Sequence, residues 1–98
     1  MDAIMRGIFE QFIDSILNNE NLLVGAQKTF EIPLECPVEK VEDMMFGYVV
    51  GRIIQFLDTA FQLRYQRLPT SEEAVESGEM IVRRAAEIKS RIKLVMNK

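Results

Sequence analysis

The fold of this chain is decided by the stretch MMFGYVVGRIIQFL, residues 44–57, in which ten of the fourteen side chains are apolar. It contains no proline and no turn-forming dipeptide, so we interpret it as helix. A membrane-spanning helix needs about 20 apolar residues, and this shorter stretch carries Arg52 inside it. We therefore predict a helix that is covered by other protein and makes no contact with a membrane.

The helix around this stretch is predicted to cover residues 37–68. Pro37 suits the first helical turn, where a missing amide hydrogen has no effect, and another proline follows the last turn. Thr70 and Glu73 have the spacing of a capping box, which begins a last helix over residues 70–97. Two long helices joined by so short a turn are expected to form an antiparallel hairpin.

The N-terminal third combines a helix with a segment of different periodicity. Apolar residues come in pairs every four residues over residues 3–18, which predicts an amphipathic helix that ends at the following asparagines. In residues 22–35, Phe30, Ile32 and Leu34 alternate with polar residues and proline, which predicts a β-like extended arm or hairpin. An ordered loop is the alternative for this segment.

Two apolar stripes run along the central helix, and each needs a partner. The first is predicted to face the last helix, where large side chains pack on glycines that allow close approach. The predicted pairs are Phe61 with Gly78, Ile88 with Gly51, and Ile92 with Gly47. The second stripe contains Met45, Val49, Ile53, Phe56, Ala60 and Leu63. The N-terminal helix can cover only part of this second stripe, so we predict that a second copy of the chain covers the rest.

These predictions combine into one fold for a single domain, residues 1–98. The expected class is all-α with a minor β-like arm. A short N-terminal helix and a long antiparallel helical hairpin are expected to assemble as a homodimeric helical bundle. A domain of this size buries only about two-thirds of its unfolded surface, and small domains often gain stability by oligomerising.

The composition restricts the chemistry that the chain can perform. It contains no histidine, the commonest general base and metal ligand, and its single cysteine excludes an internal disulfide. We therefore expect no catalytic residues, no cofactor and no metal site, hence no enzyme. A lone cysteine is typical of a reducing environment, so we expect a cytoplasmic protein. The formal net charge of −3 provides no general attraction for nucleic acid.

Basic residues nevertheless concentrate in the last helix. Candidate contacts to nucleic-acid phosphates are Arg83, Arg84, Lys89, Arg91 and Lys93. The alternative is that these cations stabilise the C-terminal end of the helix and pair with acidic residues of its neighbour.

Two further features have a chemical and a structural interpretation. Acidic clusters at residues 39–43 and 72–76 have a spacing that suits Mg²⁺, but the hairpin places them at opposite ends, so only a partner chain could join them. We favour their role as helix N-terminal caps. Cys36 lies where a helix begins, which can favour a reactive thiolate, but nearby glutamates oppose this and an unreactive cysteine is preferred.

The expected function is non-catalytic. We expect a small intracellular helical assembly protein that acts through homodimerisation and through binding of another macromolecule, whose identity the sequence does not indicate. The first alternative is a nucleic-acid-associated protein that uses its basic C-terminal helix. The second is a carboxylate-metal hydrolase formed across a dimer.

Overall fold

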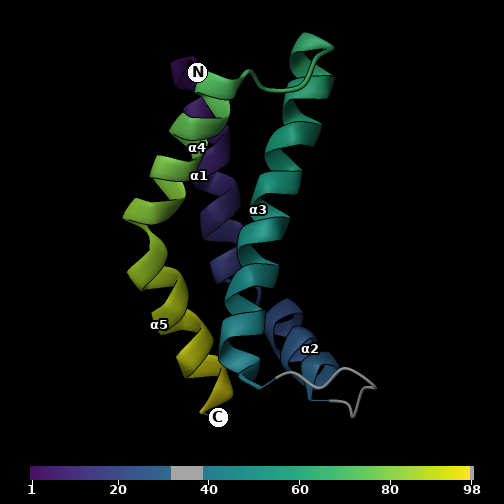
Figure 1. Cartoon of the computed structure of the whole chain (residues 1–98), viewed down its shortest axis with the longest axis vertical. Helices are drawn as coiled ribbons and strands as arrows, with labels where there is room; N and C mark the ends of the chain where they lie inside the picture. The colour runs from purple at the N-terminus through teal and green to yellow at the C-terminus, as the bar shows by residue number, and fades with distance from the viewer. Residues whose placement is uncertain (32–38, 98) are drawn as a thin grey trace.

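The structure, a computed structural model, describes residues 1–31 and 39–97. Its helices are α1 (Ala3–Leu17), α2 (Glu20–Phe30), α3 (Val41–Tyr65), α4 (Ser71–Arg83) and α5 (Ala85–Met96). No strand occurs in these described ranges, so the all-α prediction is confirmed for them. α3 forms one column, and α4 and α5 form a second column that runs back alongside it (Figure 1). α1 lies behind the space between the columns, and α2 lies beside the first turns of α3.

The first two helices each begin at a side-chain cap. The Asp2 carboxylate accepts a hydrogen bond from the Met5 amide at 2.7 Å, and the Asn19 side chain accepts one from the Leu22 amide at 3.0 Å. Such caps satisfy amides that have no partner within the helix. α1 ends at Leu17, so the asparagine run that ends this helix also begins the next one.

The β-like arm is wrong for residues 22–30, which belong to α2. Leu23 and Ala26 are buried and Phe30 is partly buried, and steps of three and four residues are those of a helix. The alternation that suggested a strand runs on into residues 32–35, which lie outside the described residues. Eleven residues are too few for a stable isolated helix, so packing on α3 and α5 stabilises this one.

The buried residues of α3 form one stripe. It shares residues with each of the two predicted stripes but matches neither of them completely. The buried residues are Met45, Val49, Ile53, Leu57 and Phe61. Four residues advance about 400° around a helix, so the buried side turns by about 40° at each step. The first part of α3 therefore packs on α2 and α5, and its last part lies beside α1 (Figure 1).

The predicted glycine contacts inside the hairpin are wrong. Gly47 and Gly51 are exposed, and a methyl group on either of them or on Gly78 would meet no packed atom within 4 Å. Their three predicted partners are buried against other residues. Because the buried side of α3 turns around the helix, the side that carries both glycines stays outside the core.

The predicted last helix is interrupted at Arg84. It begins as expected, since the Thr70 hydroxyl accepts from the Glu73 amide at 3.2 Å and the Glu73 carboxylate accepts from the Thr70 amide at 2.9 Å. At Arg84, φ is −106° and ψ is 7°, and its amide donates to the Ile81 carbonyl at 3.0 Å. α5 then buries Ile88, Ile92 and Val95. No proline or glycine marks this break, so the sequence pattern could not show it.

Candidate interaction surfaces

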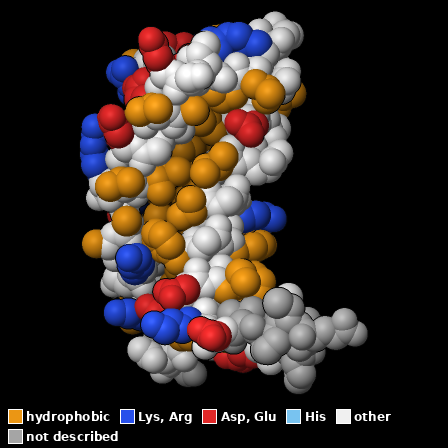
Figure 2. Space-filling model, viewed as in Figure 1, with side chains coloured by type: hydrophobic (Ala, Val, Ile, Leu, Met, Phe, Trp, Pro, Cys, Tyr) orange, Lys and Arg blue, Asp and Glu red, His pale blue; other side chains and the backbone are white. Residues whose placement is uncertain are grey.

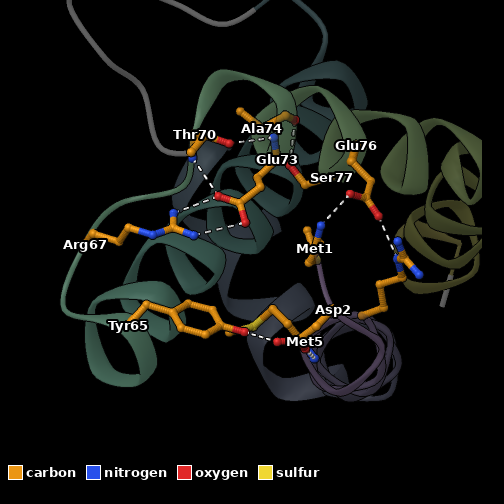
Figure 3. Close-up of polar contacts among 11 residues, drawn as sticks. Met1, Asp2, Met5, Tyr65, Arg67, Thr70, Glu73, Ala74, Glu76 and Ser77 are labelled. Carbon is orange, nitrogen blue, oxygen red and sulfur yellow. Dashed lines mark hydrogen bonds and ion pairs between the residues drawn. The ribbon is translucent and has the colours of Figure 1, made fainter.

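A polar cluster closes the end of the molecule where α3 ends and α4 begins (Figure 3). Arg67 donates to both oxygens of Glu73, at 2.7 and 3.3 Å. The Tyr65 hydroxyl donates to Asp2 at the start of α1, and the Arg67 guanidinium lies 5.3 Å from the centroid of the Tyr65 ring. These contacts hold the turn in which Gln66 adopts a left-handed φ of 54°.

Glu76 ties α4 to α1 in the same cluster. It accepts a hydrogen bond from Arg6 Nε at 2.6 Å and one from the amino group of Met1 at 3.0 Å. These donors lower the pKa of Glu76, and the hydrogen bonds from Arg67 lower the pKa of Glu73 to about 2. Across the described residues, no buried side-chain nitrogen or oxygen lacks a partner. The cluster acts as a clamp that joins three helix ends.

Acid is expected to weaken this clamp and to destabilise the fold. A carboxylate with a lowered pKa stabilises the folded state above its unfolded pKa, and this contribution is lost as the pH falls through the folded value. For Glu73 the pH window of this loss runs from the ordinary pKa of 4.5 down to the folded pKa of about 2. The pKa values of Asp2, Glu76 and Glu87 are lowered as well. Denaturant unfolding across this window should show a smaller acid loss for Glu73→Gln than for the wild type, and equal losses would contradict the clamp.

The acidic clusters considered as metal sites do not come together in the chain. Glu42 and Asp43 lie in the first turn of α3, and Glu73 and Glu76 lie in the first turns of α4, at the other end of the columns (Figure 1). The latter two are bound by arginines. Within the described part of the chain, no group of three or more metal-ligating side chains is placed to hold an ion.

Arg84 is one of the two basic candidates that are partly buried. Its guanidinium donates to Glu87 at 2.9 and 3.0 Å, to Asp14 at 2.5 Å and to Glu10 at 3.1 Å, and its side chain is 16% exposed. Hydrogen bonds to Glu87 and Asp14 raise the pKa of Arg84. Its donors are used inside the chain, where they join α1 to the break between α4 and α5.

The other four basic candidates face in different directions. Arg91 donates to a backbone carbonyl of α1 at 2.7 Å. Lys89 lies 5.0 Å from the ring centroid of Phe46, and Lys93 lies 3.9 Å from a glutamate, so both turn towards α3. Arg83 is exposed on α4. Of the predicted nucleic-acid contacts, Arg84 and Arg91 thus bond to α1, Lys89 and Lys93 turn towards α3, and Arg83 lies on α4.

A groove of about 420 Å³ lies between α1 and α3. It is lined by Met5, Ile8, Phe56, Thr59, Ala60, Leu63 and Arg64. Beside it the rings of Phe12 and Phe56 stack, with centroids 3.8 Å apart and planes within 4°. Leu63 stands at the groove with 79% of its surface exposed. The groove is therefore an apolar concave surface beside a protruding apolar side chain. We name it the α1/α3 groove.

The α1/α3 groove contains the uncovered half of the second predicted stripe. The first three residues of that stripe are fully buried in the chain. Phe56 and Ala60 are only partly buried, and Leu63 is exposed. From the sequence we expected this stripe to be covered incompletely. We did not predict helix α2, which packs on α3. We also did not predict the part of α1 in the groove, although Ile4, Ile8 and Phe12 recur every four residues.

A second hydrophobic surface runs between the α3 column and the α4–α5 column (Figure 2). Hydrophobic side chains form a band there, and acidic and basic side chains lie along its edges. Other exposed large hydrophobic residues outside the α1/α3 groove include Ile54 on α3 and Val82 on α4. The molecule thus has one apolar surface mixed with charges and one that is almost free of them.

Of the residues predicted to pack in the hairpin or dimer, most are enclosed by the chain itself. Those that are buried are Met45, Val49, Ile53, Phe61, Ile88 and Ile92. Phe56 lines the α1/α3 groove, Gly47 and Gly51 are exposed, and Gly78 is partly buried. Their role in a dimer stays a prediction. Cys36 lies outside the described residues.

Comparisons with protein-family models, with curated proteins and with solved structures found no match for this chain. Among the described helices, none is long and apolar enough to cross a membrane.

Proposed function

We propose that this protein is a small intracellular helical assembly protein that acts by forming a homodimer and by binding another macromolecule. The α1/α3 groove is the observation that carries the proposal, because an apolar stripe that starts in the core continues there into solvent. Leu63 is 79% exposed on α3, and Ile4 is 60% exposed on the adjoining side of α1. Apolar positions at helical spacing are the usual surface through which one helix binds another.

The dimensions of the molecule support this proposal. Its extents of 41 × 27 × 20 Å describe an elongated body. Monomers rarely leave large contiguous apolar patches exposed, and such patches usually mark binding surfaces. Association through the groove would remove such a patch from water.

The polar side chains support a function for this protein that does not involve catalysis. Glu73, Glu76 and Arg84 show the perturbed pKa values that often mark active sites, but each is explained by a contact between helix ends. Their contacts have the geometry of structural ion pairs. The assembly function requires only the shape and apolar character of the surface.

The proposal is tested by the mass of the protein in solution. Sedimentation velocity and light scattering at micromolar concentration should give twice the chain mass of 11.3 kDa. Dilution should shift the population towards monomer, because the equilibrium depends on protein concentration. A species that stays at the monomer mass at every concentration measured would overturn the homodimer.

A further inference from the structure

We propose that the α1/α3 groove is the dimer interface and that it is covered by the same groove of a second copy, related by a two-fold axis. This inference rests on the proposed function and adds to it the surface that is used. In a two-fold interface the same patch is present on both partners, so it must be complementary to itself in charge and in shape. The groove meets both requirements.

The charge requirement is met because Arg64 is the one charged residue that lines the groove, and several exposed residues of the two helices that form it are neutral. On α1 they are Gly7, Gln11 and Ser15, and on α3 they are Gln55 and Thr59. Charged residues make up 28% of the whole chain, so a groove in which Arg64 is the one charged lining residue is poorer in charge than the chain as a whole. Depletion of charge is characteristic of the centre of protein interfaces. A neutral patch can face its own copy without placing like charges opposite each other.

Arg64 is the single charged residue that lines the groove. Its Nε donates to the Tyr65 hydroxyl at 3.3 Å, and its guanidinium lies 5.6 Å from the centroid of the Tyr65 ring. Tyr65 in turn bonds to the Asp2 carboxylate. This charge is therefore held within the chain and partly balanced there, and it leaves the rest of the groove apolar.

The shape requirement is met by a protruding side chain next to a hollow. Leu63 is 79% exposed and adjoins a groove of about 420 Å³. A two-fold axis through this surface places Leu63 of each copy against the groove of the other, as in knobs-into-holes packing. A groove of this volume also falls within the size range of small-ligand sites, roughly 300–1000 Å³. An apolar ligand is therefore the competing occupant that the test has to separate.

The test compares Leu63→Glu with the matched control Val82→Glu. Both side chains are well exposed, 79% and 73%, so both variants should keep the helix content of the wild type by circular dichroism. Sedimentation equilibrium should show the dimer dissociation constant raised at least about 100-fold by Leu63→Glu, because a carboxylate would be moved from water into a largely apolar interface whose one lining cation, Arg64, is already bonded to Tyr65. Val82→Glu, which lies away from the groove, should change it less than about threefold.

The outcomes separate this inference from the proposed function. If the wild type and Leu63→Glu dimerise equally, the groove is not the interface, while the assembly function stands. If the wild type is monomeric, the assembly function fails and this inference fails with it. If the wild type is monomeric and binds an apolar dye that Leu63→Glu does not bind, the groove is the binding site of a small apolar ligand.

Salt provides an independent measurement on the unmodified protein. A neutral interface should keep its dissociation constant within about threefold between about 0.05 and 0.5 M NaCl, because screening acts on charges. A dimer formed through the charge-edged band between the columns would respond strongly to salt. A steep dependence on salt would therefore overturn the assignment to the α1/α3 groove.

Discussion

Phe61→Ala is expected to lower the free energy of unfolding by about 3–5 kcal/mol, the usual range for removing a buried phenylalanine. Phe61 is 0% exposed, and its ring centroid lies 5.2 Å from that of Tyr65. The Arg67 guanidinium lies 5.3 Å from the centroid of the Phe61 ring. The substitution would therefore leave a cavity under the clamp that joins α3 to α4. The total free energy of unfolding of a small domain is about 5–15 kcal/mol, so this loss would be a large fraction of it.

Urea unfolding followed by circular dichroism measures this effect. Gln62→Ala is the matched control, because Gln62 is the exposed next residue of the same helix and alanine is a good helix former. Its effect should stay within about 0.5 kcal/mol. All proteins must be compared at one concentration, since dimer dissociation is coupled to unfolding. Equal effects of the two substitutions would show that Phe61 does not lie in the core.

Gly25→Pro is expected to cost about 3 kcal/mol or more and to disrupt α2. Gly25 lies in the middle of this helix, where proline removes a backbone hydrogen bond and its ring collides with the preceding turn. The loss would release Leu23 and Ala26 from the core, since both are buried by the helix. Denaturant unfolding and the far-ultraviolet signal should both report the damage.

Gly25→Ala provides the control at the same position. A methyl group there would meet no packed atom within 4 Å. Alanine should therefore raise the stability by up to about 1 kcal/mol through its better helix propensity. A β-hairpin with its loop near Gly25, in place of α2, would tolerate proline there. Unchanged stability of Gly25→Pro would therefore contradict α2.

The candidate interface could be predicted from sequence only in part. The heptad spacing of Phe56, Ala60 and Leu63 marks an apolar stripe that one chain covers incompletely. The expectation that the other stripe faces the last helix was wrong, because Gly47 and Gly51 are exposed. Sequence spacing shows which residues share a face of a helix. It does not show which neighbouring helix that face contacts, because the buried side of α3 rotates along the helix.

Local signals in the sequence determined that most of the described residues are helical, and they determined several helix ends. The Thr70 capping box and the asparagines after α1 act through hydrogen bonds to nearby amides, so the residues that make them are close in sequence. Only the tertiary structure decided that residues 22–30 are helix and that the last helix breaks at Arg84. Both depend on contacts with distant residues: the packing of α2 on α3 and α5, and the bonds from Arg84 to Glu10 and Asp14. Packing between segments far apart in the chain also left the α1/α3 groove open, because α2 and α5 cover one half of the stripe and α1 covers only part of the rest.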